Sequence, residues 1–498
     1  MRLTRQNPVD RSCEAAHDPA PPAPLTGFGA LFLGSMILAL AAWLAYSGVV
    51  ELGFTYDDQD YLDNARMAHA DPVRLIRPAI DAPWASRLGV HLYFYALYPW
   101  LGQSASGYHG ANLVLHWVNG VLLMVLVARH QRNAIVGGIA ALLFILSPAP
   151  YRAVLWISAV SLVLGLTGVL AALLLIQALL TPDERTPADT GPALLRKRGS
   201  GLRLVAWTLA VLLFTAAAFL HQGYAAAALL PVLLAREMGV RDWRLAGVLI
   251  AFTASGLLVV AAERWLYAGA YTAHAQYSLW GTHIFSNLAK YAFGLLVGQW
   301  LDPQGLQTPL SLVLSVGAAV TVLLVSLLMR PRQRFWAAWI FVTVLPFLFW
   351  TRPMVFSRYF YPPAASTAVL LTQGGLAVYT WIARHSRRLA AFAAVFLLCA
   401  VTITGIVRLR RSHAVQLYDE GKFLLFEIRD PVRASERLEA ALAVDHRIPA
   451  KVRIWLAWAY FQQGEGQRAQ SILREVLATH PDHRQARRLL ESMGAAPP

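Results

Sequence analysis

The stretch TGFGALFLGSMILALAAWLAYSGVV, residues 26–50, contains no charged side chain and decides the fold class. A helix needs about 20 apolar residues to cross the hydrocarbon core of a bilayer, and this run provides them. Similar runs recur along the chain. We expect about eleven membrane-spanning helices in total, at residues 26–50, 110–129, 134–149, 153–179, 204–221, 223–236, 245–266, 306–329, 335–350, 359–383 and 389–408.

The composition supports this interpretation. Of the 498 residues, 57% are hydrophobic and 14% are charged, whereas soluble domains carry about 25% charged residues. The net charge of +15 does not indicate nucleic-acid binding, because the basic residues form short clusters between apolar runs, as in cytoplasmic loops. Cys13 and Cys399 are far apart and predict neither a disulfide framework nor a metal site. The sequence therefore predicts an all-α, polytopic membrane helical bundle.

The basic clusters also set the expected orientation. They share one side only if the N-terminus is cytoplasmic and residues 267–305 stay outside, with 284–300 as a re-entrant or interfacial helix. The largest outer loop is then 51–109, and the C-terminal region lies outside, although an arginine cluster at 408–411 opposes the charge rule. Abundant Arg and Ala beside few Lys indicate a GC-rich bacterial genome. We therefore expect a bacterial inner membrane with the outer loops and C-terminal domain in the periplasm.

A soluble, Ala-rich pattern begins near residue 412. It follows the tetratricopeptide (TPR) period of about 34 residues, at Leu456, Tyr460, Gly464, Ala469, Leu473 and Pro481. A weaker copy lies upstream, at Ala434, Leu438 and Ala441. We therefore divide the chain into a disordered cytoplasmic tail at 1–25, a membrane domain at 26–411 and a small TPR-like helical domain at 412–498. A generic amphipathic hairpin is the alternative to a TPR.

Four aspartates follow the first span directly. Asp57, Asp58, Asp60 and Asp63 lie in GFTYDDQDYLDNAR, residues 53–66, at the depth of the membrane boundary. Solvated residues at the end of a span are one reading, but ionised groups at this depth are costly and tend to have a use. Such a carboxylate can act as a general base toward a hydroxyl or ligate a divalent cation. Adjacent acids point different ways, so one of Asp57 and Asp58 can do chemistry while the other orients it.

Two further segments carry polar side chains near the outer side. In the second span, polar residues recur every three to four positions from His109 onward and so share one helix face. We expect the inner ones to hydrogen-bond between helices and His109, at the outer end, to contact substrate. The loop before the tenth span carries Arg352, Arg358 and Tyr361. Arginine there either snorkels to the interface or grips a lipid-linked phosphate through paired hydrogen bonds.

Taken together, four segments resemble one known family. They are YDDQDYL (56–62), GYHGANLVLHWVNGVLLMVL (107–126), YRAVLWISAVSLVLGL (151–166) and SRYFYPPAAS (357–366). In this order they resemble the GT-C superfamily of polyprenyl-phosphate-sugar glycosyltransferases. The closest branch is the protein O-mannosyltransferase-like group, whose membrane domain carries C-terminal TPR repeats.

The resemblance implies roles for particular residues. The family's catalytic carboxylate follows the first span, where this chain has Asp57 and Asp58. The arginine of its Arg-Tyr-x-Tyr motif corresponds to Arg358 and is expected near the donor phosphate. From the residues of the loop itself, we expect Arg352 and Tyr361 beside it. The implied donor is a sugar on a polyprenyl phosphate in the outer leaflet, with no nucleotide cofactor; a divalent cation, held by Asp57 or Asp58, stays open.

The chain also departs from the family pattern. Relatives often have His-Pro-x-His before the fourth span, where this chain has SPAPYR at 147–152. Relatives often have Lys-Glu after the fifth span, where this chain has His221 and Gln222. The missing glutamate implies a different acceptor, metal independence or lost activity, and His221 is the polar residue that stands in its place.

We therefore expect an integral membrane glycosyltransferase that moves a sugar from a polyprenyl-phosphate donor to an acceptor hydroxyl on a protein or glycan. Its TPR-like domain would bind an acceptor protein or another protein partner. Two alternatives remain open. One is a non-enzymatic membrane scaffold with TPR-mediated partner binding, and the other is a ligase that moves whole lipid-linked glycans.

Overall fold

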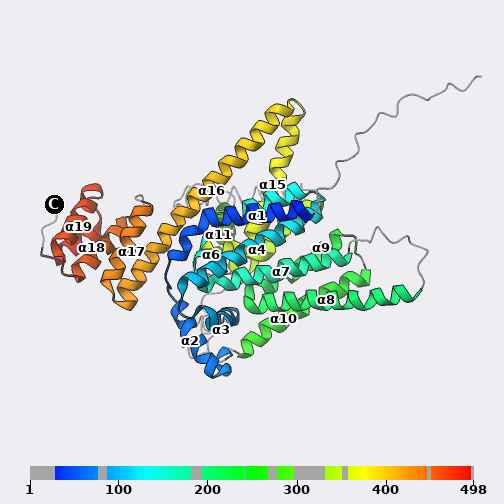
Figure 1. Ribbon diagram of the computed structural model, residues 1–498, viewed down its shortest axis with the longest axis horizontal. Helices are drawn as coiled ribbons and strands as arrows, with labels where there is room; N and C mark the ends of the chain where they lie inside the picture. The colour runs from blue at the N-terminus through cyan, green and yellow to red at the C-terminus, as the bar shows by residue number, and fades with distance from the viewer. Residues whose placement is uncertain are drawn as a thin grey trace, which may run out of the picture.

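The computed structural model describes residues 28–76, 87–180, 193–240, 242–266, 278–295, 331–349, 351, 357–445 and 450–494. Every regular element within these ranges is helical, which confirms the expected all-α class. The helices form an elongated bundle that carries a smaller helical unit at one end (Figure 1).

Six helices of the described chain are long and apolar enough to cross a membrane. They are α1 (Phe28–Tyr46) with the 3-10 helix η1 (Ser47–Glu51), α4 (Ala105–Gln131), α7 (Val160–Leu180) with η4 (Ile157–Ala159), α8 (Ala193–Leu220), α10 (Asp242–Leu266) and α16 (Arg387–Phe423). Shorter apolar helices are α5 (Ala134–Ile145) and α14 (Pro331–Leu348). These helices are compatible with a membrane protein.

The expected eleven spans are not all present as long apolar helices. The segment 223–236 forms the 3-10 helix η5 (Gln222–Ala228) followed by α9 (Leu229–Glu237). A nine-residue α-helix rises only about 14 Å, which is half of a bilayer core. The tenth expected span is α15 (Tyr361–Ala383), preceded by η9 (Ser357–Phe360), and the expected span 306–329 lies outside the described residues. Eleven spans therefore stay a prediction.

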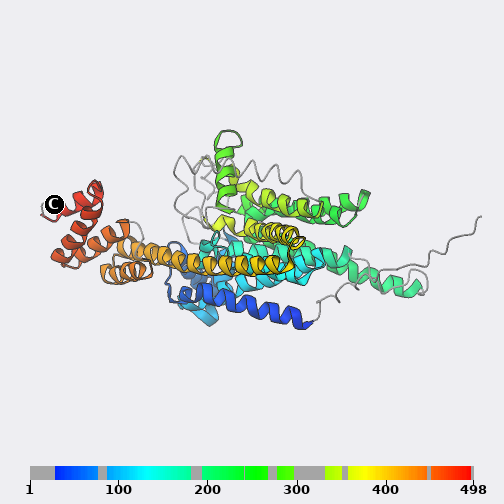
Figure 2. The same ribbon diagram turned by 90° about the horizontal axis from the view of Figure 1, so that it is seen from above.

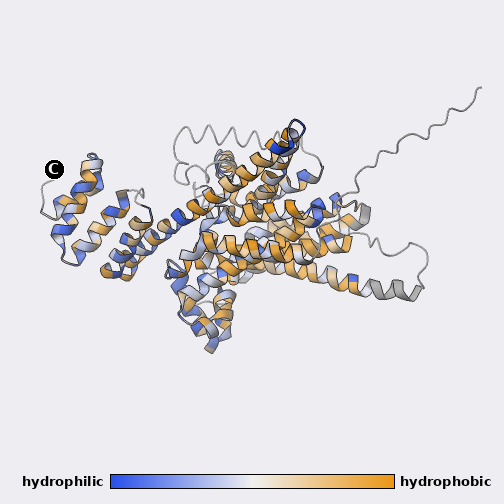
Figure 3. Ribbon diagram, turned by 45° about the horizontal axis from the view of Figure 1, so that its top comes forward, coloured by the Kyte–Doolittle hydropathy of each residue, from blue (hydrophilic) through white to orange (hydrophobic). Residues whose placement is uncertain are grey.

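The long helices of the bundle consist mostly of hydrophobic residues (Figure 3), and several of these side chains lie on the outside of the bundle. Phe32 and Leu33 of α1 are 58% and 61% exposed, and Leu202 of α8 is 77% exposed. Soluble monomers rarely expose contiguous apolar surface of this kind. The interior is held by polar contacts as well as by packing, since Asn119 Nδ2 of α4 donates to the carbonyl of Val163 in α7 at 2.9 Å.

Within the expected first outer loop, the described residues 52–76 and 87–104 form a small helical cap at one end of the bundle. It contains α2 (Asp58–Ala70), the 3-10 helix η2 (Pro72–Leu75) and α3 (Leu88–Leu101). Tyr61 of α2 stacks on Phe94 of α3, which packs against Tyr108 near the start of α4. The aromatic side chains thus attach the cap to α4. The expected helix 284–300 corresponds in part to α11 (His283–Phe293), and its residues 296–300 lie outside the described residues.

The long helix α16 leads without a break into the C-terminal unit, so the boundary expected at residue 412 falls inside a continuous helix. The π-helix η10 (Leu424–Ile428) ends it, and α17 (Pro431–Val444), α18 (Ala450–Gln462), α19 (Gly466–Thr479) and α20 (Arg484–Ser492) follow. Both ribbon views place α17 at the same end of the bundle as α2 (Figures 1 and 2). The helical cap and the C-terminal unit therefore share one end of the bundle.

The C-terminal unit has the packing that the TPR spacing predicts. Its crossing-point residues are all buried, at Ala434, Leu438, Ala441, Leu456, Tyr460, Ala469 and Leu473. Gly464 lies between α18 and α19 with φ +85°, a conformation that glycine adopts without strain. The small residues allow neighbouring helices to approach closely, and the bulky ones fill the space between them.

Candidate functional site

The acidic turn after α1 begins with a strained residue. Tyr56 has φ +52°, a left-handed conformation that is uncommon for a residue with a bulky side chain and costs roughly 1–3 kcal/mol. Asp57 follows in a helical conformation and Asp58 is the first residue of α2. A backbone held in this way fixes the directions of the two adjacent carboxylates, which is common where a residue is positioned for function.

Asp58 is an anchor. It is fully buried, and its Oδ2 accepts from the Thr55 backbone N at 2.9 Å and from the Thr55 hydroxyl at 3.4 Å. Its Oδ1 accepts from the Ser158 backbone N at 2.8 Å and from the Ser158 hydroxyl. Burial and the neighbouring Asp57 charge raise the pKa of Asp58 to about 7, and these hydrogen bonds act in the opposite direction. Both oxygens are engaged, so Asp58 joins the acidic turn to η4.

Asp57 has one engaged and one unengaged oxygen. Its side chain is 8% exposed, and its Oδ2 lies 3.2 Å from Nη1 of Arg87. Its Oδ1 is buried without a hydrogen-bond partner among the described residues. A buried carboxylate oxygen without a partner is costly, and it is the kind of group that a substrate hydroxyl satisfies. Asp57, rather than Asp58, therefore has an oxygen without a hydrogen-bond partner among the described residues.

Two arginines lie close enough to affect the charge of Asp57. Burial raises the pKa of Asp57 above its ordinary value, while the guanidinium groups of Arg87 and Arg358 lower it. Arg87 also forms a side-chain hydrogen bond with Tyr61. Asp57 thus contacts one cation and lies within electrostatic range of a second. Such a site favours a ligand that carries a negative charge near a proton to be removed.

Arg358 is held by aromatic rings. Its side chain is 9% exposed, with its guanidinium carbon 4.5 Å from the ring centroid of Trp156 and 4.9 Å from that of Tyr359. Its Nη2 donates to the Tyr359 hydroxyl at 3.1 Å. Stacking of this kind is specific to the planar guanidinium and restricts its motion, so Arg358 is oriented before any ligand arrives.

His221 completes the cluster from the end of α8. Burial lowers the pKa of His221 to about 3, with the charges of Arg87 and Arg358 acting in the same direction. Its Nδ1 accepts from the Gly223 backbone N at 3.1 Å. The ring is therefore neutral at physiological pH, and its Nε2 carries the proton, which makes it a hydrogen-bond donor beside the arginines.

The structure gathers only some of the expected site residues. Asp57, Arg358 and His221 lie in one cluster. Tyr361 is fully buried, and its hydroxyl lies 2.9 Å from Nδ1 of His116 inside the bundle. His109 is also buried, with Nε2 3.5 Å from the carbonyl of Gly53, so it lies beneath the chain that leads to the turn.

Arg352 lies outside the described residues. Arg87 also belongs to the site, although no sequence pattern predicts it there. It precedes an apolar helical run in the segment 51–109, and only the fold shows that this arginine meets Asp57.

A divalent cation does not fit this cluster. Hard cations take about six or more oxygen ligands, yet Asp58 uses both oxygens within the protein and Asp57 offers only one. Two arginines close to the same carboxylate would repel a cation. In the described part of the chain, no group of three or more His, Cys, Asp or Glu residues could hold a metal ion. We therefore assign no step to a metal.

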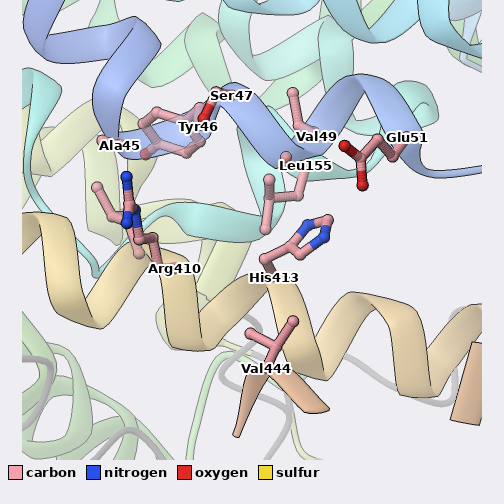
Figure 4. Close-up of a pocket in the computed structure, with 11 residues that line it drawn as sticks. Ala45, Tyr46, Ser47, Val49, Glu51, Leu155, Arg410, His413 and Val444 are labelled. Atoms are coloured by element: carbon pink, nitrogen blue, oxygen red, sulfur yellow. The ribbon is translucent and has the colours of Figure 1, made fainter. Parts of the chain in front are cut away.

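A separate pocket of about 250 Å³ lies between η1, α6 (Tyr151–Leu155), α16 and α17. Glu51 and His413 approach it from facing elements, and Arg410 lies one helical turn before His413 (Figure 4). Its lining contains none of the residues of the Asp57 cluster. It therefore belongs to the junction between the bundle and the C-terminal unit.

Comparison with known proteins identifies one region of the chain. The family model of the tetratricopeptide repeat matches residues 425–493, which confirms the TPR predicted from the sequence spacing. No curated protein matches the chain. TPR units commonly bind other proteins through their stacked helices, so a protein–protein contact at the C-terminal end is supported.

Proposed function

We propose that the protein is an integral membrane glycosyltransferase that uses a polyprenyl-phosphate-linked sugar as donor. The observation that carries the proposal is the state of Asp57, a buried carboxylate with one oxygen that lacks a partner among the described residues; it contacts Arg87 and feels the charge of Arg358. The acid lies directly after an apolar helix long enough to cross a bilayer. A donor anchored in the membrane and an acceptor in water can meet at this depth.

The carboxylate and the two arginines have different roles in the proposed transfer reaction. Oδ1 of Asp57 accepts the proton of an acceptor hydroxyl as that oxygen attacks the anomeric carbon of the sugar. The bond between that carbon and the phosphate oxygen breaks, and the polyprenyl phosphate leaves with the electron pair. Arg358 and Arg87 stabilise the negative charge that grows on the phosphate. Protonated Asp57 then returns its proton to water.

The TPR unit supports a role in choosing the acceptor. It lies at the same end of the bundle as the acidic turn, and it is matched by a family whose repeats commonly bind proteins. We therefore propose an acceptor protein or a partner that delivers the acceptor. A membrane scaffold remains the second candidate, because the same TPR match is what a scaffold needs.

The function is tested by mass analysis of glycan-bearing products from cells with and without the gene. Loss of a single hexose-sized mass from a protein or glycan on deletion supports transfer of one sugar. Loss of a whole oligosaccharide in one step instead identifies a ligase of lipid-linked glycans. Unchanged glycans, together with loss of a protein that co-purifies with the intact chain, would replace the proposal with the scaffold.

A further inference from the structure

The C-terminal end of α16 contacts the segment that leads to Asp57 at several residues. Nε2 of Gln416 donates to the Thr55 hydroxyl at 3.3 Å. The backbone N–H of Gly53 donates to Glu420, and a side chain at position 53 would collide with that carboxylate, since a Cβ there would lie 2.5 Å from Glu420 Oε1. The contacts cross from the C-terminal helix to the chain between η1 and α2.

Asp419 holds the strained residue itself. Burial raises the pKa of the Tyr56 hydroxyl, and the Asp419 carboxylate lies close enough to raise it further. Nη2 of Arg152 donates to Oδ2 of that carboxylate at 2.5 Å and so fixes its position. The Tyr56 ring centroid lies 5.3 Å from that of Trp156 and 6.5 Å from that of Phe423. Tyr56 therefore contacts two rings and has the Asp419 carboxylate near its hydroxyl.

The first TPR helix, α17, contacts Glu420 at the end of α16. Nε of Arg437 in α17 lies 3.0 Å from Glu420 Oε1, and Glu420 is 3% exposed. The carboxylate that binds the Gly53 backbone is thus also bound by the C-terminal unit. Rotation of α17 away from α16 would separate Arg437 from Glu420. The buried carboxylate of Glu420 would then lose its cation while it still contacts Gly53, just before the acidic turn.

We propose that Asp419 is a positioning residue. With Arg152 it holds Tyr56 in the left-handed conformation, and this sets the carboxylate of Asp57 beside Arg87 and Arg358. The C-terminal helix and the TPR unit thereby complete the transfer site instead of only recruiting an acceptor. The inference rests on the proposed function for its catalytic meaning, but the geometry that it asserts is testable without any activity.

The first test probes position 57 directly. Cys13 and Cys399 are replaced by serine, Asp57→Cys is introduced, and labelling by a membrane-impermeant maleimide is timed in membranes. We expect slow labelling with Asp419 present and labelling about tenfold faster with Asp419→Ala, since release of the strained turn lowers the barrier to exposure. Asp445→Ala is the matched control, because it removes a different carboxylate that pairs with α16, through Arg411 at 3.9 Å.

The second test asks whether Asp419 acts through Tyr56. Glycine takes a left-handed conformation without strain, so Tyr56→Gly should make transfer much less sensitive to Asp419. We expect Asp419→Ala to lower transfer about tenfold when Tyr56 is present and by less than half of that factor with Tyr56→Gly. Equal factors in both backgrounds would show that Asp419 only supports folding and would overturn the inference.

The two tests separate the two proposals. If no chain transfers sugar but Asp419→Ala speeds labelling of the Asp57→Cys variant, the positioning contact stands and the glycosyltransferase proposal fails. If transfer occurs but Asp419→Ala changes neither the labelling rate nor the transfer rate, the positioning inference fails alone. Equal labelling of the Asp419→Ala and Asp445→Ala variants likewise contradicts it.

Discussion

Arg87 Nη1 and Asp57 Oδ2 lie 3.2 Å apart although the residues are 30 positions apart in the chain. This contact joins the start of α2 to the start of α3, the two helices of the cap. It occupies one oxygen of Asp57 and leaves the other without a partner in the described residues. Arg87 therefore orients the carboxylate of Asp57 and lowers its pKa.

Removal of Arg87 should shift the pH dependence of transfer. Burial raises the pKa of Asp57 and Arg87 lowers it, so Arg87→Ala should raise the pKa further. Asp57 must be ionised to accept a proton, and the acidic limb of the rate profile should therefore move to higher pH, by about one unit or more. The profile of transfer rate against pH measures this. Arg66→Ala is the control, because Arg66 pairs with Asp63 at the surface; an unchanged acidic limb in Arg87→Ala would contradict the assignment.

Substitution of Asp58 should act on stability rather than on chemistry. Asp58→Ala leaves the donors of Thr55 and Ser158 without their acceptor, and we expect a loss of about 3 kcal/mol in the free energy of unfolding. Thermal unfolding of the purified protein in detergent measures it. Asp60→Ala, at an exposed position on the same helix, should cost far less.

The stabilising effect of Asp58 should also depend on pH in a defined direction. Its pKa in the folded protein is about 7, above the ordinary value of 3.8, so the folded state binds the proton more tightly than the unfolded state. The contribution of this proton is fully present below about pH 4 and is lost as the pH rises toward 7. The free energy of unfolding of the wild type should therefore fall relative to that of Asp58→Asn as the pH rises from about 4 to about 7. A difference that is independent of pH would contradict the raised pKa.

Arg358 should not be replaceable by lysine. The guanidinium stacks on Trp156 and bonds to Tyr359, and a lysine ammonium has neither the planar face nor the paired donors. We expect both Arg358→Lys and Arg358→Ala to lower kcat/KM for the lipid-linked donor about tenfold or more. Arg388→Ala, at an exposed position, is the control. A Lys variant with the wild-type kcat/KM would show that a point charge is enough.

The TPR unit should unfold when its core is truncated. Leu473 is fully buried between the helices of the unit, and Leu473→Ala should cost about 3 kcal/mol. Limited proteolysis of the full chain should then cut between residues 425 and 493, while the membrane bundle resists. Arg474→Ala, one residue away and exposed, should leave the digestion pattern unchanged.

Features carried by local patterns could be predicted from the sequence. The apolar runs predicted the all-α bundle, and the spacing from Leu456 to Leu473 predicted the TPR that the family comparison confirms. The acids after the first span could also be recognised, because a charged cluster at the end of an apolar run is visible in the chain itself. Such signals lie within one or two helical turns, or within one repeat.

Features that depend on long-range contacts could not be predicted. The choice between Asp57 and Asp58 depends on Ser158, which lies 100 positions from Asp58, and on Arg87, which has no motif of its own. Tyr361 was expected at the substrate, but it bonds to His116 inside the bundle, 245 positions away. The segment 223–236 reads as a continuous apolar run, yet it is divided between η5 and α9.

The most direct test of the central claim compares glycan-bearing products in cells that express wild type, Asp57→Asn, Asp60→Asn or no protein, at matched membrane abundance. Asparagine keeps the size of the side chain but cannot accept the proton at Oδ1. We expect Asp57→Asn to lose the same product mass as the deletion, by at least about a hundredfold in rate, while Asp60→Asn matches wild type. A glycosylated product made at the wild-type rate by Asp57→Asn would contradict the account.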